Sequence, residues 1–158
     1  MKSSICTMFG IEFPLIAFTH CRDVVVEVSK AGGMGVLGAA GHTTESLEID
    51  LLWIDEHIGG NPYGVDLIAP TSMASATEGA SLQDLTRMVP NEHQEYASKI
   101  LSTHNISTDD IYTKRRRGAS SFLTPDGAAN IIDVAFAHPI KLIVNALGVP
   151  PAYMIEMG

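Results

Sequence analysis

The run GGMGVLG at Gly32–Gly38 places a short apolar segment between glycines. From Gly33 onward it matches the spacing Gly-x-Gly-x-x-Gly of dinucleotide-binding loops. Those loops follow a strand and open a helix, so that the pyrophosphate meets the N-terminus of that helix. Here a predicted helix comes before the run, and Met34–Gly38 has the composition of a buried strand. We therefore interpret the glycines as a helix end followed by close helix-on-strand packing, and not as a nucleotide loop.

Three further apolar runs indicate more strands of the same kind. Phe13–Phe18 (FPLIAF) precedes the first run, Tyr63–Ile68 (YGVDLI) follows it, and Ile140–Leu147 (IKLIVNAL) comes much later in the chain. Short runs that are apolar on both faces are typical of buried parallel strands. The sequence therefore predicts four strands of a parallel sheet.

Helices are predicted between these strands. Val24–Ala31 is expected to be helical because Asp23 can cap its start and Gly32 can end it, although its valines would also suit a strand. Glu45–Ile58 is a clearer helix, with one apolar stripe. That stripe consists of Leu47, Leu51, Ile54 and Ile58. Alternating strands and helices with short connections predict a parallel sheet with right-handed crossovers.

A polar segment rich in Ser and Thr interrupts this alternation after the third strand. We place an insertion at about 70–138, with helices near Asn91–His104 and Asp126–Ala137 and a basic run at Lys114–Arg117. Insertions of this size in β/α proteins often form lids or contact surfaces. The alternation resumes with the fourth strand, and Pro151 is suited to the start of another helix.

The predicted fold class is α/β, as the N-terminal half (about four βα units) of a TIM-type (β/α)8 barrel. Such a barrel needs roughly 200 residues or more. We therefore expect residues 1–158 to form the N-terminal part of one domain that the chain does not complete. The competing architecture is a small, open, doubly wound sheet.

Composition excludes several classes of partner. The formal net charge of -8 disfavours nucleic acid and anionic membrane surfaces. Cys6 and Cys21 are isolated, so no metal-binding spacing is present and a reducing compartment is expected. Met1–Phe13 contains Glu12 and lacks the long apolar run of a signal peptide, and no run of about 20 apolar residues follows. We expect a cytoplasmic protein.

Candidate site residues follow from the barrel architecture, in which ligands bind at the C-terminal ends of the strands. Those ends are expected at Phe18–His20, Gly38–His42, Asp66 and Asn145–Gly148. Asp66 lies inside an apolar strand, where a carboxylate needs a ligand, a backbone amide or an arginine as its partner. Asn145 occupies a similar place on the fourth strand. We expect ligand contacts from both.

The histidines and Cys21 are weaker candidates. His20 and Cys21 could form a thiolate–imidazole pair. Neighbours at a strand end point in different directions, however, so a structural role is the better interpretation for Cys21. We expect a structural role for His138 and an exposed position for His42.

Four segments, taken in order and spacing, resemble nitronate monooxygenases, formerly called 2-nitropropane dioxygenases. They are Ile11–Ile16 (IEFPLI), Ala31–Gly38 (AGGMGVLG), Tyr63–Leu67 (YGVDL) and Asn145–Pro151 (NALGVPP). The long insertion, together with Phe18–Asp23 (FTHCRD), resembles an actinobacterial-type subgroup of nitronate monooxygenase-like proteins.

The resemblance implies a β/α barrel that binds FMN at the strand ends and oxidises alkyl nitronates with oxygen to carbonyl compounds and nitrite. It places the backbone of Ala17, Phe18 and Thr19 near the flavin. It also places a third-strand polar residue there, commonly Asn in the family and Asp66 in this chain. A carboxylate differs from an amide in charge and in donor capacity. Ala17–His20 departs from the Gln-Gly-Gly-Met that the family often has, so the substrate within this class stays open.

The family's catalytic histidine lies in an Ala-Gly-Gly-His segment, and its phosphate-binding glycines lie on the last two strands; neither has a counterpart in this sequence. No catalytic residue is therefore assigned, and we expect this chain alone to bind FMN poorly and to be inactive. Two alternatives remain: a flavin-dependent enoyl reductase on the same barrel, and a non-catalytic half-barrel. A half-barrel would expose strand edges and associate with itself or with another chain.

Overall fold

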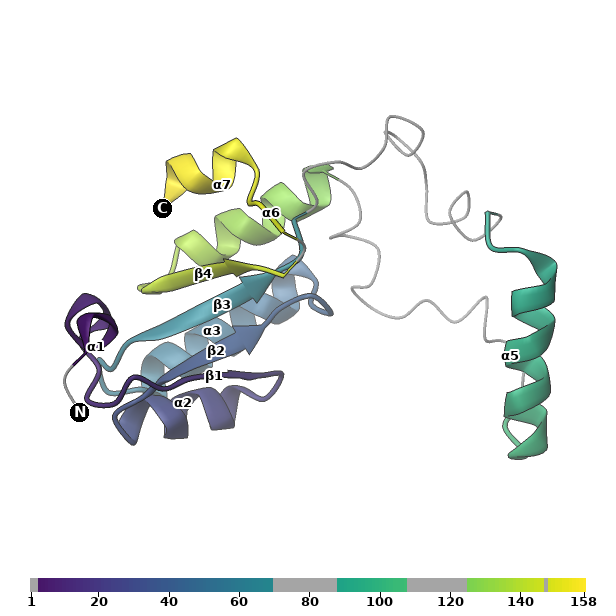
Figure 1. Ribbon diagram of the computed structural model, residues 1–158, viewed down its shortest axis with the longest axis horizontal. Coiled ribbons are helices and arrows are strands. Elements are labelled where there is room, and N and C mark those ends of the chain that lie inside the picture. Colours follow the sequence, from purple (N-terminus) through teal and green to yellow (C-terminus); the bar gives the residue numbers. More distant parts are fainter. Residues whose placement is uncertain (1–2, 70–87, 108–124, 147) are drawn as a thin grey trace. The chain divides into compact units, whose positions relative to one another are not determined.

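The chain folds around a four-stranded parallel sheet with strand order β1-β2-β3-β4, which confirms the predicted parallel arrangement (Figure 1). The structure is a computed structural model that describes residues 3–69, 88–107, 125–146 and 148–158. Each strand pairs in parallel with the next strand along the chain. The strands are β1 (Ile16–Thr19), β2 (Met34–Gly38), β3 (Tyr63–Leu67) and β4 (Leu142–Asn145).

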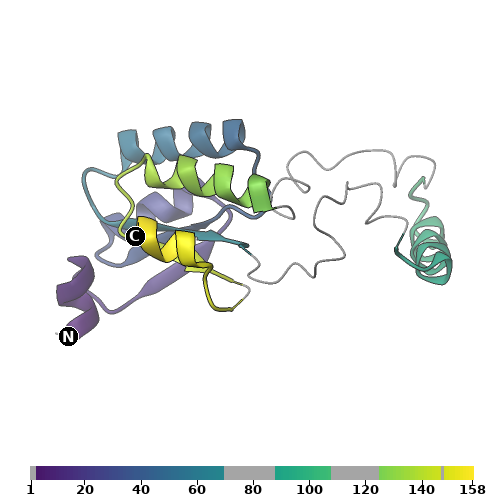
Figure 2. The same ribbon diagram turned by 90° about the horizontal axis from the view of Figure 1, so that it is seen from above.

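The helices around the sheet are α1 (Ser4–Phe9), α2 (Arg22–Lys30), α3 (Thr44–His57), α6 (Pro125–Phe136) and α7 (Ala152–Met157). Of these, α2, α3 and α6 come between successive strands and bury one face of the sheet. Helix α3 packs against both α2 and α6, and Figure 2 shows α3 and α6 side by side on the same side of the sheet. The main core lies between these helices and the sheet, and it includes Leu37, Tyr63 and Val65.

Helix α2 begins at Arg22, two residues before the predicted start, because Cys21 already takes the N-cap position with an extended backbone. The capping role expected for Asp23 is therefore wrong, since Asp23 lies inside the first turn. Its negative charge still favours the helix there through the macrodipole. The predicted end is confirmed, because Gly32 follows the helix with a left-handed φ of 94°.

Gly35 marks the close approach of α2 to β2. A Cβ atom at this position would lie 2.4 Å from the carbonyl oxygen of Val25, so only glycine fits. Val25 and Val26 are buried on α2, which explains why these valines belong to a helix and not to a strand. Close helix-on-strand packing is therefore the structural role of the glycine run, as predicted.

The apolar stripe predicted for the second helix is confirmed in α3. Leu47, Leu51 and Ile54 have no exposed surface, and Ile58, which follows the helix directly, is 3% exposed. The stripe faces the main core, where it packs with residues of the sheet and of α6. Its burial fixes the rotation of α3 and hence the position of the residues at its start.

Helix α6 confirms the helix predicted near Asp126–Ala137 and belongs to the core. Ile131, Ile132 and Ala135 are buried in it, and the helix packs on α3 and β3. It therefore acts as the crossover helix between β3 and β4, although the predicted insertion of about 70–138 includes it.

The chain divides into two compact units, of which the second spans residues 72–116. Its described part, residues 88–107, contains α5 (Asn91–Thr103), which agrees with the predicted helix. No side chain of α5 is buried. The basic run Lys114–Arg117 lies outside the described residues.

Helix α1, which the sequence pattern did not predict, covers the N-terminal end of the sheet. Cys6 and Ile11 form a small cluster there with Met34, which is fully buried. At the opposite terminus of the chain, α7 begins directly after Pro151, as predicted, and Met154 joins the main core. Among the described residues, every helix is too short or too polar to cross a membrane.

Candidate functional site

The face of the sheet opposite the helices carries Phe18, Gly38 and Asp66 near the C-terminal strand ends. Gly35 faces α2, and because side chains alternate along a strand, Gly38 faces the opposite side. Gly38 is paired in register with Asp66, so both point away from the helices. A Cβ atom at Gly38 would lie 2.7 Å from atoms of the Phe18 ring, which places that ring on the same face.

Asp66 is the most unusual polar residue of this face. Its Oδ1 atom is buried and has no hydrogen-bond partner within the described part of the chain. Burial raises the pKa of this carboxyl group, and the nearby charge of His20 opposes that rise. Among the described residues, neither an arginine nor a backbone amide, two of the three partners expected from the sequence, bonds this oxygen.

His20 is held in a defined orientation at the end of β1. Its Nδ1 atom lies 3.1 Å from the carbonyl oxygen of Gly38. Because a carbonyl only accepts, Nδ1 carries the hydrogen, and the neutral ring then has its lone pair on Nε2. The ring packs edge-to-face with Phe18 at a centroid distance of 5.0 Å. A Cβ atom at position 38 would lie 2.7 Å from His20 Nδ1, so the glycine makes room for this arrangement.

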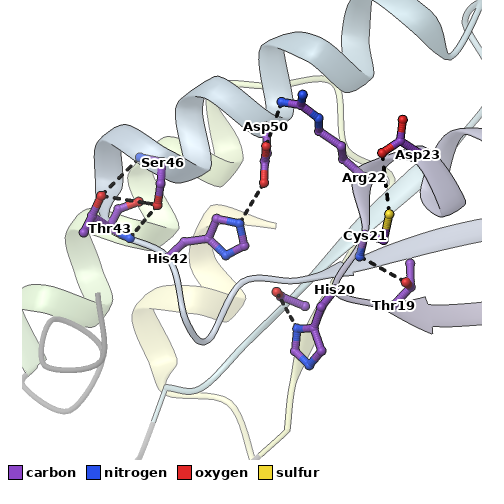
Figure 3. A network of polar contacts seen from close by, with 10 residues as sticks. Thr19, His20, Cys21, Arg22, Asp23, His42, Thr43, Ser46 and Asp50 are labelled. Carbon is purple, nitrogen blue, oxygen red and sulfur yellow. Dashed lines mark hydrogen bonds and ion pairs between the residues drawn. The ribbon is translucent and has the colours of Figure 1, made fainter. Parts of the chain in front are cut away.

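Cys21 and His20 do not form a catalytic pair. The thiol of Cys21 donates to Asp23 Oδ2 at 3.5 Å, whereas the ring of His20 bonds Gly38. Figure 3 shows the two side chains pointing in different directions from the end of β1. The expected structural role of Cys21 agrees with its place at the N-cap of α2, although its side chain is exposed.

A charged network connects the β2–α3 loop to the start of α2. Arg22 Nη1 donates to Asp50 Oδ1 at 2.9 Å, and His42 Nε2 lies 2.9 Å from Asp50 Oδ2 (Figure 3). The guanidinium of Arg22 also lies over the ring of Trp53, 4.7 Å from its centroid. The exposed position expected for His42 is wrong, because its side chain is only 15% exposed.

The sequence offered little sign of this network. Asp50 lies beside the buried stripe of α3, and its two partners are 8 and 28 residues away. The available signal was that Asp50 directly precedes Leu51, a residue of the buried stripe, which places its carboxylate at the edge of the buried face. Its partners are set by the crossover geometry, which brings the start of α2 to α3.

The start of α3 is fixed by a capping box. Thr43 Oγ1 accepts from the backbone N–H of Ser46 at 3.1 Å, and Ser46 Oγ accepts from the backbone N–H of Thr43 at 2.8 Å (Figure 3). This pair satisfies backbone donors that the helix itself leaves unpaired. A cleft of about 520 Å³ lies above it. The residues that line the cleft are His20, Gly38, Gly41, His42, Ser46, Ile49 and Asp50.

Asn145 bonds the backbone instead of pointing into the site. Its amide oxygen accepts from the N–H of Ala69 and its amide nitrogen donates to the carbonyl of Ala69, both at 3.0 Å. Register with Leu67 places Asn145 on the helix-covered face of the sheet. Its amide ties the loops after β3 and β4 together, and a ligand contact from Asn145 stays a prediction.

The predicted backbone contacts of β1 also stay predictions. Ala17 pairs in register with Gly35, which faces α2, so the side chain of Ala17 points to the helices. Thr19 Oγ1 accepts from the N–H of Cys21 at 3.1 Å and so shapes the turn into α2. Of the three predicted residues of β1, Phe18 is the one whose side chain lies on the candidate face. Within the described ranges, no group of three or more His, Cys, Asp or Glu side chains is placed to hold a metal ion.

Known proteins resemble this chain in sequence and in fold. No protein-family model matches the chain. A Mycobacterium tuberculosis protein named "Putative monooxygenase Rv1533" is 41% identical over 160 residues, which cover 99% of this chain and 42% of that protein. A "Probable nitronate monooxygenase" of Staphylococcus aureus is 29% identical over 77 residues, 46% of this chain and 21% of that protein.

Among solved structures, nitroalkane oxidase from Streptomyces ansochromogenes matches 98% of this chain and 39% of its own chain, with a TM-score of 0.62 and 17% identity. The chain is thus an α/β protein whose four consecutive parallel strands match part of a β/α barrel. By sequence it is a distant relative of the nitronate monooxygenases, as its motifs predicted. It spans less than half the length of each of these relatives.

Proposed function

We propose that the chain forms part of a flavin-dependent enzyme that oxidises alkyl nitronates, with FMN at the C-terminal ends of β1, β2 and β3. The observation that carries this proposal is the buried Oδ1 atom of Asp66, which has no hydrogen-bond partner among the residues that the structure describes. A native protein seldom leaves such an atom without a partner, so the site is suited to a ligand that supplies one. The similarity to monooxygenases, together with the resemblance of the sequence motifs to nitronate monooxygenases, supports a flavin as that ligand.

The residues at the strand ends fit the ring of a flavin. Gly41 leaves open space where a side chain would stand, whereas the rings of Phe18 and His20 lie over Gly38. Phe18 is 56% exposed, so its ring offers an apolar surface to a flat ligand. His20 presents Nε2, because Nδ1 is held by the Gly38 carbonyl. These groups suit a flat molecule with polar atoms along its edge.

The same residues offer no free cation for the phosphate of FMN. Arg22 is the cationic side chain described near these strand ends, and it is paired with Asp50 at 2.9 Å. The proposal therefore assigns the ring, and not the phosphate, to this part of the protein. Bound FMN would supply the transfer of electrons from the nitronate to dioxygen. Asp66 and His20 would orient the ring through hydrogen bonds, and Phe18 would keep water from it.

The test starts with the purified 158-residue chain, mixed with FMN and then passed over a desalting column. Flavin absorbance retained near one equivalent supports the proposal, and a colourless protein contradicts flavin binding by this chain. Retained flavin then allows a second test, in which propane 2-nitronate is added and oxygen consumption and nitrite are measured. Oxidation of NADH or NADPH without nitronate turnover would instead indicate the flavin-dependent reductase.

A further inference from the structure

The residues that flank Asp66 on the sheet have no side chain that could pair with its carboxyl group. In register it lies between Gly38 of β2 and Val144 of β4, and neither of these has a polar side chain. The carboxyl oxygen Oδ1 is buried, and no described residue forms a hydrogen bond with it. An ionised carboxylate in such a place loses its hydration without gaining a partner. A protonated carboxyl group avoids most of this cost and gains an O–H donor.

The titratable group that acts on Asp66 from another element is His20, at the end of β1. Among the described residues, it is the group whose charge influences the Asp66 carboxyl, and it stabilises the ionised form only while it is protonated. Burial acts in the opposite direction and is the larger effect. His20 is exposed, and its Nδ1–H is directed to the Gly38 carbonyl and not to Asp66. Within the described part of the chain, no other side chain compensates the Asp66 carboxyl group, which is only partly buried and so can be reached by a ligand.

We propose that Asp66 takes up one proton when an uncharged, flat ring binds here, and that its O–H then donates to an acceptor atom on the edge of that ring. This inference rests on the proposed function, because the isoalloxazine ring of FMN is a ligand of this class. A ring over the strand ends removes water from the carboxyl group and brings no compensating charge, so it favours the protonated form.

The proton linkage also defines which ligands the site favours. A ring edge with carbonyl oxygens and unprotonated nitrogens accepts the Asp66 O–H. A cationic or donor-rich edge would stabilise the ionised carboxylate instead and would bind better as the pH rises. An asparagine at this position offers an N–H donor at every pH, so Asp66 makes binding pH-dependent where an amide would not.

The test measures the Kd of FMN for the 158-residue chain from pH 5 to pH 9, with Asp66→Asn and His20→Gln as the variants. At pH values above the pKa of Asp66 in the ligand-free chain, the Kd of the unmodified chain should rise with pH. The rise should be up to about tenfold per pH unit relative to the Kd of Asp66→Asn. The ratio cancels the ionisation of the FMN phosphate. His20→Gln retains a donor for the Gly38 carbonyl and should keep this slope. Calorimetry in buffers of different ionisation enthalpy should show uptake of about one proton, absent in Asp66→Asn.

Three results would overturn the inference in distinguishable ways. Equal pH slopes for the unmodified chain and Asp66→Asn would remove Asp66 while leaving the proposed flavin site. A slope that disappears in His20→Gln and persists in Asp66→Asn would assign the proton to His20. Failure of all three proteins to bind FMN at every pH, with their circular dichroism spectra unchanged, would overturn the proposed function and this inference with it.

Discussion

His138 Nδ1 lies 2.6 Å from Asp55 Oδ2, although 83 residues separate the two in sequence. The other ring nitrogen lies 3.1 Å from Glu48 Oε2, and Asp55 Oδ1 accepts from the hydroxyl of Tyr63 at 2.7 Å. The His138 side chain is 5% exposed. This cluster fastens the end of α6 to α3, which confirms the structural role predicted for His138.

The cluster makes the stability of the chain dependent on pH. Burial alone would lower the pKa of His138, but hydrogen bonds to Asp55 and Glu48 outweigh it and raise the pKa above its usual 6.5. The folded state therefore holds this proton more tightly than the unfolded state. Its stabilising contribution is complete below about pH 6.5 and is lost as the pH rises through the folded-state pKa.

His138→Gln should therefore reduce the free energy of unfolding by about 1–3 kcal/mol at pH 6. The difference from the unmodified chain should shrink as the pH rises, and urea denaturation at several pH values measures it. His93→Gln is the matched control, because His93 is exposed on α5 and its substitution should have little effect at any pH. A constant difference between pH 6 and pH 9 would show that His138 stabilises the fold without its charge.

Gly35→Ala should destabilise the chain because the added methyl group would meet the Val25 backbone at 2.4 Å. Backbone atoms cannot move aside as a flexible side chain can, so α2 would have to shift away from β2. We expect a loss of about 1–3 kcal/mol or more, measured as a lower midpoint of urea denaturation. Gly41→Ala is the control: a Cβ atom there meets nothing within 4 Å, and the midpoint should hardly change. Equal midpoints for the two variants would contradict the close packing.

The four strands, their parallel arrangement and the helices other than α1 could be predicted because they depend on local patterns. The stripe that ends at Ile58 has a helical period, and Met34–Gly38 is an apolar run of strand length. The start of α2 was less predictable, since Cys21 and Asp23 compete for the cap and only the backbone conformation decides between them.

The candidate site was predictable in place but not in detail. Asp66 was identified because a carboxylate in an apolar strand is rare, and none of the described residues bonds its Oδ1. Asn145 stood out for the same reason, yet its amide is engaged by the backbone of Ala69. An unusual polar residue in a strand thus indicates an unmet hydrogen-bonding requirement, but tertiary contacts decide whether a ligand or the backbone meets it.

Asp50→Ala should lower the free energy of unfolding more than the loss of an ordinary surface ion pair does. It removes the shared partner of Arg22 and His42, each at 2.9 Å, from a carboxylate that is only 25% exposed. We expect a loss of about 1–2 kcal/mol, since hydrogen bonds to charged groups contribute at the upper end of the usual range. Glu27→Ala, which removes a pair of 3.8 Å from an exposed carboxylate, should cost less than about 0.5 kcal/mol. Similar losses in urea denaturation would show that the Asp50 network is only a surface feature.

Asp66→Asn should make the ligand-free chain more stable at neutral pH, which is the opposite of the usual effect of removing a native charge. Burial raises the pKa of Asp66 in the folded state above its unfolded value, so folding favours the protonated carboxyl group. The stability that Asp66 contributes is complete below about pH 3.9 and is lost as the pH rises through the folded-state pKa.

Asparagine has nearly the same shape as aspartic acid and cannot ionise, so Asp66→Asn keeps the packing and removes this loss. The difference in urea midpoint between the two proteins should be small near pH 4 and should grow in favour of Asp66→Asn towards pH 7. Asp23→Asn is the control, because Asp23 is exposed in the first turn of α2, where its negative charge stabilises the helix, and its substitution should lower stability at pH 7. The opposite result would be a loss of stability in Asp66→Asn, relative to the unmodified chain, that is larger at pH 7 than at pH 4. It would show that the ionised carboxylate already has a hydrogen-bond partner in the folded chain and needs none from a ligand.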